Sequence, residues 1–439
     1  MARILQPKQE KDDATCRKAI KTTGEAFPDG TVLELVRLNS GADETSLLRW
    51  DGESATTGQQ FEVNGKVYRA PQLSSTFLRA LRLPGRVAPY GSTHALFNDI
   101  CKVFTQYTDL AEDHVRQIAY FILGCWLADR LFVAPFLSII APLSAAKAQL
   151  LRLLSSLCRR PLMLAEATPA ALSRLASLRP TFLFDEPTLS RRAERLLYAS
   201  NNYRQFALGN GRIADVFSAK VICTREPLRD AMLASQALEI TLSPADRQVP
   251  FLEEKISERI ADEFQSKLLQ YRLTNICKIR TPEIDVSELT VPMQGVARAL
   301  ASCVVNHEEL QLGVVQLLFG QGEYLDASIE LGSVVLEALL FCCHEEGRSQ
   351  VLSGKLADIV NTIWAERGEG WRTNPESVGW KLRALGLRTV PIGGAGNGLM
   401  LTEAVCARIH SLAEGHRVPS LRQAARVECP HCKIVLVGP

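Results

Sequence analysis

The stretch Phe136-Leu-Ser-Ile-Ile-Ala-Pro-Leu-Ser-Ala-Ala-Lys-Ala148 decides the fold class of this 439-residue chain. Its first five residues form an apolar run typical of a buried strand, and a short loop leads from them into a helical pattern that ends near Arg159. Further apolar runs alternate with helical patterns through residue 242. Short apolar runs separated by helices are typical of parallel strands that are covered on both faces. The sequence therefore predicts an α/β fold with a mostly parallel sheet flanked by helices.

The loop after the first predicted strand has the length of the phosphate-binding pattern G-x-x-x-x-G-K-[ST]. In that pattern the glycines let backbone N–H groups converge on phosphates, the lysine reaches the β- and γ-phosphates, and the hydroxyl binds Mg²⁺. Lys147 is present, but Ala141 and Ala146 replace the glycines and Ala148 replaces the hydroxyl residue. A methyl group at position 146 crowds the phosphate path, and Mg²⁺ loses a direct ligand. We expect ATP and Mg²⁺ to bind weakly or not at all, and hydrolysis to be negligible.

Two later strand ends supply further candidate site residues. The run Thr181-Phe-Leu-Phe-Asp-Glu186 ends in two acids, of which Asp185 is placed to hold Mg²⁺ and Glu186 to polarise the attacking water. The run at 219–224 ends in Thr224 and Arg225, where a polar group would sense the γ-phosphate. Taken alone, the alanine-rich loop is an ordinary helix start. The order and spacing of the strands, loop and acids favour a nucleotide site.

Adjacent carboxylates repel each other unless a cation lies close to them. In this fold the strand before the loop and the strand that ends in the acids are expected to lie side by side. We therefore expect Lys147 to form an ion pair with Asp185 at the place where metal and phosphate would bind.

From about residue 92 to residue 243, the chain resembles the helicase-type P-loop ATPases, AAA+-related and near superfamily 3, that accompany primases on plasmids, phages and integrated elements. The resemblance is carried by Leu-Leu-Arg-Leu-Leu at 150–154, Phe-Leu-Phe-Asp-Glu at 182–186 and Ala-Asp-Val-Phe-Ser-Ala-Lys-Val at 214–221. The last run is similar to the family's Phe-Asp-x-Phe-Gly-x-Lys. An arginine that often approaches the nucleotide in this family corresponds here to Gln236. The resemblance implies a P-loop ATPase core, here with a degenerate nucleotide site.

The rest of the chain divides by pattern into regions around this core. The N-terminal region has short strand patterns, two of them joined by the hairpin signal Asn64-Gly65-Lys66. The predicted division is a β-rich module at 1–90, the ATPase-like core at 91–250, a helical region at 251–346, a winged-helix domain at 347–415, and a tail at 416–439.

The predicted winged helix consists of two helices, a glycine-rich hairpin at 387–401 and a final helix. Similar domains end many primase-associated helicases, and the resemblance extends to about His410. From residue 351 onward there are 11 Lys and Arg against 7 Asp and Glu, which gives this part a mildly basic character. We predict that Lys381, Arg383 and Arg388 contact DNA. Use of the same domain for protein contacts stays the alternative.

The tail contains Cys429-Pro-His-Cys432, which has the spacing of half a zinc ribbon. A second half is not evident, and His431 lies awkwardly between the two thiols. We interpret Cys342-Cys343-His344 as part of a helix with core and surface positions and no metal. A zinc site at Cys429 and Cys432 therefore stands beside the simpler interpretation of a reduced, unliganded pair.

Composition limits the classes of function. A formal net charge of +2 is too small for binding to nucleic acid through bulk charge, so any DNA contact requires a local patch. Neither a secretory signal nor a membrane span is apparent, and cysteines scattered singly in apolar runs fit a reducing cytoplasm. Three interpretations follow: a DNA-binding helicase-like ATPase that forms a homo-oligomer, a non-catalytic adaptor or scaffold, and a decaying element protein without activity.

Overall fold

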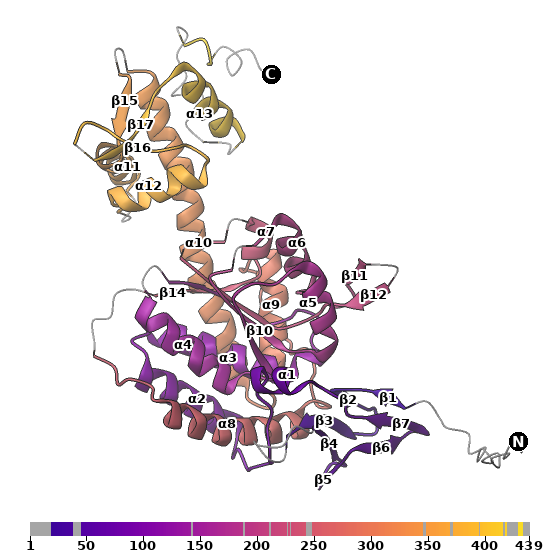
Figure 1. Ribbon diagram of the computed structural model, residues 1–439. Coiled ribbons are helices and arrows are strands. Elements are labelled where there is room, and N and C mark those ends of the chain that lie inside the picture. The colour runs from indigo at the N-terminus through magenta and orange to yellow at the C-terminus, as the bar shows by residue number, and fades with distance from the viewer. Residues whose placement is uncertain are drawn as a thin grey trace, which may run out of the picture. The chain divides into compact units, whose positions relative to one another are not determined.

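The computed structural model describes residues 19–37, 45–141, 144–187, 189–209, 212–225, 227–228, 230–242, 248–345, 348–368, 372–394, 396–415, 418 and 429–432 (Figure 1). The chain divides into two compact units, Met1–Phe319 and Gly320–Pro439. The division falls inside the long helix α10 (Glu308–Cys343). Among the described residues, no helix combines the length and the apolarity needed to cross a membrane.

The centre of the first unit is a five-stranded sheet in which every pairing is parallel. Its spatial order is β14 (Leu238–Thr241), β8 (Phe136–Ile140), β13 (Lys220–Thr224), β10 (Thr181–Asp185) and β9 (Pro161–Leu164). The α/β class with a parallel sheet flanked by helices is thereby confirmed. The inner strands β8, β13 and β10 were visible in the sequence because burial on both faces makes each of them a mostly apolar run.

Alternate side chains of each strand enter different cores. Leu137, Ile139 and Val221 pack with the helices of one face, whereas Phe136, Phe182 and Ile222 pack with those of the other. The first face is covered by α2 (Thr93–Tyr107), α3 (Glu112–Leu127), α4 (Ser144–Leu157), α8 (Glu254–Asn275) and α9 (Val291–Ser302). The second is covered by α5 (Pro169–Leu175), α6 (Arg191–Ala199) and α7 (Ala231–Ala234). Figure 1 shows α2, α4 and α8 on one side of the sheet and α5 and α6 on the other.

The N-terminal region forms two small sheets within the same compact unit. One is antiparallel and consists of β2 (Gly24–Ala26), β3 (Val32–Val36), β4 (Ser46–Trp50) and β5 (Ala55–Gly58). The other consists of β1 (Ile20–Lys21), β7 (Lys66–Arg69) and β6 (Gln60–Val63), and the short helix α1 (Ser75–Ala80) follows. The predicted hairpin is present, with positive φ at Asn64 and Gly65. Val32 and Val36 face the large core of the α/β part, while Leu33 and Leu35 face a smaller core of their own.

A buried ionic cluster joins β3 to the α/β part of the unit. Glu34 is 1% exposed, and its carboxylate lies 2.7 Å from Arg159 and 2.7 Å from Arg272 and also accepts from Arg160. Arg272 of α8 forms a further pair with Asp129 at 2.6 Å. Burial alone would raise the pKa of Glu34, but the three guanidinium groups lower it to about 2. Every carboxylate and guanidinium of the cluster therefore has a buried partner, which is the condition for tolerating charges in a core.

The described part of the second unit has its own core. Its elements are the end of α10, β15 (Gln350–Leu352), α11 (Ser353–Glu366), α12 (Pro375–Ala384), β16 (Val390–Pro391), β17 (Asn397–Met400) and α13 (Glu403–Gly415). The strands form an antiparallel sheet in the order β15-β17-β16. Val334, Leu356, Val378 and Leu382 are among the side chains that fill the core. Asn374 caps α12 by accepting from the Ser377 N–H at 2.8 Å.

Candidate nucleotide site

The predicted nucleotide-site residues lie at the carboxyl ends of the parallel strands. Asp185 ends β10 and Glu186 follows it, Thr224 ends β13 and Arg225 follows it, and Lys147 lies on α4, the helix after β8. The carboxyl ends of parallel strands lie at one edge of a sheet, which is where α/β proteins bind ligands. The fold thus brings Lys147, Asp185, Glu186 and Arg225 to one edge.

At this edge Lys147 binds both acids. Its Nζ lies 2.9 Å from Oδ1 of Asp185 and also donates to Oε1 of Glu186. Arg225 approaches Glu186 from another direction, with Nε 2.9 Å from Oε2. The expected ion pair between Lys147 and Asp185 is confirmed, and Glu186 and Arg225 extend it into a chain of four charged groups.

The reason given for that ion pair was wrong. β8 and β10 are not neighbours, because β13 lies between them. The pairing register places Cys223 of β13 between Ile139 of β8 and Asp185 of β10. Lys147 reaches the acids because its long side chain spans the end of the intervening strand.

The electrostatic environment favours the charged forms of Lys147 and Glu186. Burial alone would lower the pKa of Lys147, but hydrogen bonds to Glu186 and Asp185 and their charges raise it above its usual value. The hydrogen bond from Lys147 lowers the pKa of Glu186, and the charges of Lys147 and Arg225 lower it further. The lysine that would reach a phosphate is therefore already neutralised by the acids that would hold a metal.

The described backbone next to Lys147 is helical. Helix α4 begins at Ser144, so the three residues before Lys147 are already helical. The N–H groups of a first helical turn can bind an anion that lies along the helix axis, whereas a glycine loop also surrounds the phosphate from the sides. Ala146 and Ala148 are exposed on either side of the buried Lys147. Glu186 has φ of 50°, a left-handed conformation that is strained for a side-chain-bearing residue and is common at functional sites.

Two further sequence predictions concern Thr224 and Gln236. The carbonyl of Thr224 accepts the N–H of Ala141 at 2.7 Å, which joins the ends of β13 and β8. Gln236 is buried and accepts from the Asn201 amide at 2.9 Å, and Asn201 in turn accepts from Lys220. Gln236 is thus part of a polar chain inside the protein. Burial lowers the pKa of Lys220 to about 7.

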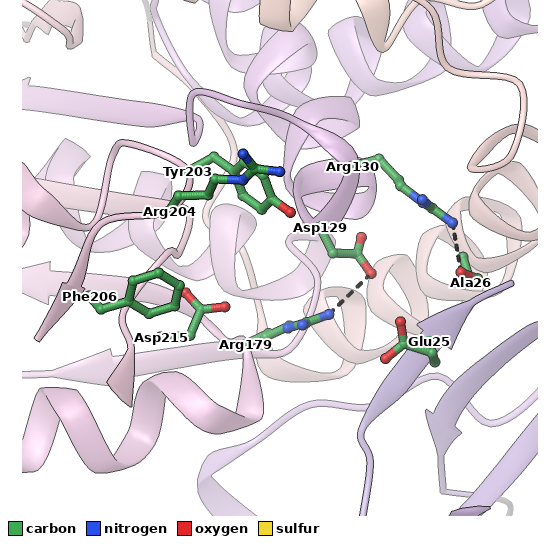
Figure 2. Close-up of a pocket in the computed structure, with 9 residues that line it drawn as sticks. All are labelled: Glu25, Ala26, Asp129, Arg130, Arg179, Tyr203, Arg204, Phe206 and Asp215. Atoms are coloured by element: carbon green, nitrogen blue, oxygen red, sulfur yellow. Dashed lines mark hydrogen bonds and ion pairs between the residues drawn. The ribbon is translucent and has the colours of Figure 1, made fainter. Parts of the chain in front are cut away.

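A cavity among the described residues lies at the opposite edge of the sheet. It has a volume of about 480 Å³, and Figure 2 shows its wall formed in part by Asp129, Arg130 and Arg179. These residues precede β8 and β10, so the cavity is at the amino ends of the strands. Arg179 lies 3.9 Å from Asp129, and Arg130 donates to the carbonyl of Ala26 at 2.6 Å. The cavity carries mixed charge and is not part of the predicted nucleotide site.

One wall of this cavity comes from a hairpin that the sequence analysis missed. β11 (Phe206–Gly209) pairs with β12 (Arg212–Asp215), and Phe206 and Asp215 line the cavity. Asn-Gly at 210–211, which lies outside the described residues, is a hairpin signal in the sequence. That signal could have identified these two strands.

The three predicted DNA contacts have different surroundings within the second unit. Lys381 is half-buried over the backbone of α10: a Cβ added at Gly332 would lie 2.7 Å from its Cε, and burial lowers the pKa of Lys381. Arg383 is exposed, with its guanidinium 5.2 Å from the centre of the Trp380 ring. Arg388 is exposed as well. Two of the three side chains are therefore available at the surface of this unit.

Cys429 and Cys432 lie beside two histidines from other parts of the second unit. The ligand atoms of His344, His410, Cys429 and Cys432 all lie within 4.8 Å of one another. The sequence did not indicate this grouping. His344 was interpreted as a residue on a helix surface, and no second pair of zinc ligands was evident for Cys429 and Cys432. The one available signal was that four of the seven histidines fall in residues 320–439.

No protein-family model matches the sequence, and no curated protein matches it significantly.

Proposed function

We propose that this protein is a non-hydrolysing relative of the helicase-type ATPases that acts as a DNA-binding adaptor in the replication or maintenance of a mobile element. One observation carries the proposal. Lys147 is bound to Asp185 and Glu186, at the place where Mg²⁺ and the terminal phosphates would be held in a working enzyme. A protein with this arrangement keeps the shape of the ATPase core and lacks its nucleotide cycle.

The end of β13 contributes the remaining candidate residues of the core. β13 separates the strand before the loop from the strand that carries the acids. Thr224 and Arg225 at the end of β13 correspond to the polar position that senses the γ-phosphate. In this chain Arg225 is paired with Glu186 instead.

Binding of ATP and Mg²⁺ would require several of these contacts to break. The metal would displace Lys147 from Asp185, and a phosphate would compete with both acids for the lysine. In an active site, glycine N–H groups and a hydroxyl ligand compensate for such changes. Here Ala141, Ala146 and Ala148 occupy those positions, so the compensation is missing.

DNA binding is assigned to the second unit. The element order α10, β15, α11, α12, β16, β17 with a three-stranded antiparallel sheet supports a winged helix. In such domains the helix before the hairpin enters the major groove and the hairpin contacts the backbone. α12 occupies that position, and Arg383 and Arg388 supply exposed positive charge on and after it.

The experiment combines ATP turnover, thermal stabilisation and DNA binding on the full-length protein. We expect hydrolysis at background level, no rise in melting temperature with ATP and Mg²⁺, and salt-dependent binding of duplex DNA that ATP does not change. Lys147→Ala should leave turnover at the same background. Turnover of about one per second or more, within the range of working ATPases and abolished by Lys147→Ala, would refute the proposal.

A protein-contact role for the second unit is the other candidate. It is favoured by Lys381, which lies against α10, and by Trp380, which is half-exposed beneath Arg383. Under this alternative, duplex DNA does not bind above the level of a neutral control protein at low salt.

A further inference from the structure

Four side chains from three segments of the second unit converge on one point. His344 directly follows α10, His410 lies in α13, and Cys429 and Cys432 belong to a turn closed by the Cys432 N–H bonding to the Cys429 carbonyl at 3.1 Å. Cys432 is 1% exposed and His410 is 4% exposed. Two of the four residues are thus buried, and His344 and Cys429 are half-buried.

Three of the six distances between the four ligand atoms match the edges of a zinc-centred tetrahedron, and the other three are at most 4.8 Å. The two Nε2 atoms of His344 and His410 are 3.2 Å apart, Sγ of Cys429 is 3.5 Å from Nε2 of His410, and Sγ of Cys432 is 3.2 Å from Nε2 of His344. Bond lengths of 2.0–2.1 Å to nitrogen and 2.3 Å to sulfur imply edges of about 3.3 Å between nitrogens and about 3.5 Å between nitrogen and sulfur. All three observed edges agree with these values to within about 0.3 Å.

A hydrogen bond at Nδ1 of His410 sets the tautomer and the orientation of its ring. Nδ1 lies 2.7 Å from the carbonyl of Cys406, one helical turn earlier. A carbonyl only accepts, so Nδ1 carries the proton and Nε2 presents a lone pair toward the other three ligands. Metal-bound histidines commonly have such a partner, which fixes both the tautomer and the ring orientation.

We propose that His344, His410, Cys429 and Cys432 bind one Zn²⁺ ion in a closed, structural site. Two thiolates and two neutral imidazoles in tetrahedral arrangement are the donor set typical of zinc. Four protein ligands leave no position for water or substrate, so the ion has no catalytic role. The site is independent of the proposed DNA and nucleotide functions.

The role of the ion is to fasten the cysteine turn to the helices of the second unit. It cross-links the end of α10, the helix α13 and residues 429–432. The first and last ligands, His344 and Cys432, are 88 positions apart in the sequence. Binding energy at a site absent from the unfolded chain becomes folding energy of the unit. Removal of zinc should therefore loosen the second unit.

The test measures metal in the full-length protein, expressed without a histidine tag. We expect about one zinc per chain, release of that zinc by a strong chelator, and a lower melting temperature after release. Reconstitution with Co²⁺ should give the visible absorption and the sulfur-to-metal charge-transfer band of a tetrahedral site with two thiolates. Cys429→Ser and His410→Ala should each reduce the zinc content to below about 0.1 per chain.

Matched controls separate ligands from neighbours. Cys406→Ser removes an adjacent thiol but keeps the carbonyl that orients His410, and His431→Ala removes the ring that packs 5.5 Å from the His410 ring. Both controls should keep a full equivalent of zinc. Wild-type protein that lacks zinc and shows no thiolate–Co²⁺ spectrum would overturn the proposal, as would equal zinc loss in the controls. If a ligand variant does not fold, the wild-type Co²⁺ titration decides the question.

Discussion

At the scale of single residues, Lys147 differs most from the role that the sequence pattern suggests. The pattern suggests a lysine that binds phosphate, whereas in the structure Lys147 pairs with two acids. Its side chain is 10% exposed and neutralises two adjacent carboxylates. Lys147→Met would remove the ion pair of Asp185 and would leave Glu186 paired, among the described residues, with Arg225, whose side chain is 70% exposed. We expect a loss of about 1–2 kcal/mol in the free energy of unfolding in metal-free buffer, measured by denaturant titration.

Lys102→Met is the matched control for this substitution. Lys102 forms a single pair with Asp99 at 3.3 Å, and its side chain is 75% exposed. Loss of such a surface pair should change stability by less than about 0.5 kcal/mol. A rise in the melting temperature of Lys147→Met would contradict the structural role of the lysine, since relief of strain on mutation is a mark of functional sites.

Glu34 gives a prediction about pH. Its pKa is about 2 in the folded protein against an ordinary 4.5, so its contribution to stability is complete above pH 4.5 and disappears as the pH falls toward 2. The shift corresponds to about 3 kcal/mol. Glu34→Gln should therefore flatten the acid limb of the stability curve between those two pH values. Glu53→Gln, an exposed loop position, should keep it.

At neutral pH the same Glu34→Gln change should be strongly destabilising. It leaves Arg159, Arg160 and Arg272 buried with Asp129 as the remaining anion of the cluster. Removal of one partner from a buried ionic cluster typically costs about 3–5 kcal/mol. An unchanged urea midpoint at pH 7 would show that the cluster does not hold β3 to the α/β part.

At the scale of elements, α12 carries the test of the winged-helix proposal. Arg383→Ala with Arg388→Ala should weaken binding to duplex DNA and reduce the slope of log affinity against log salt by about two, one unit per lost phosphate contact. Lys381→Ala is the internal comparison, because its side chain lies against α10 and should change the slope much less. Affinity and slope that stay the same in the double variant would favour the protein-contact role.

Some strands could be predicted from the sequence and others could not. The inner strands β8, β13 and β10 were predictable because each is buried on both faces and is therefore apolar along most of its length. β5 was missed because Ala55-Thr-Thr-Gly58 is mostly exposed and lacks an apolar pattern. The β11–β12 hairpin was missed for a related reason, since Phe206, Leu208 and Ile213 point into solvent and mark no core.

Candidate site residues were likewise predictable only where a local sequence pattern marks them. Lys147, Asp185, Glu186 and Arg225 were found because loop spacing and strand ends are local features of the sequence. The paired histidines were not found, because His344 and His410 approach the cysteines only after α10, α13 and the C-terminal turn have packed. Order along the chain could not show that β13 separates β8 from β10 either, since sheet order is a property of the whole fold.

At the scale of the whole molecule, the two compact units should unfold separately. Residues up to Leu318 build the large core of the first unit, whereas the core of the second begins at Val334. Calorimetry should therefore resolve two transitions. Glu34→Gln should lower only one of them, and a chelator should lower only the other. A single transition that both perturbations shift together would show that the units unfold as one.

The ionic cluster around Glu34 has a consequence for the timing of synthesis. Glu34 and Arg272 are 238 positions apart, so the anion is made long before its partner in α8. At about 5–20 residues per second, the N-terminal sheet waits roughly 12–48 s on the ribosome before the guanidinium that completes its burial exists. During that interval β3 presents a carboxylate among valines and leucines, a combination that resists premature docking. We therefore expect β3 to dock only after α8 has been translated.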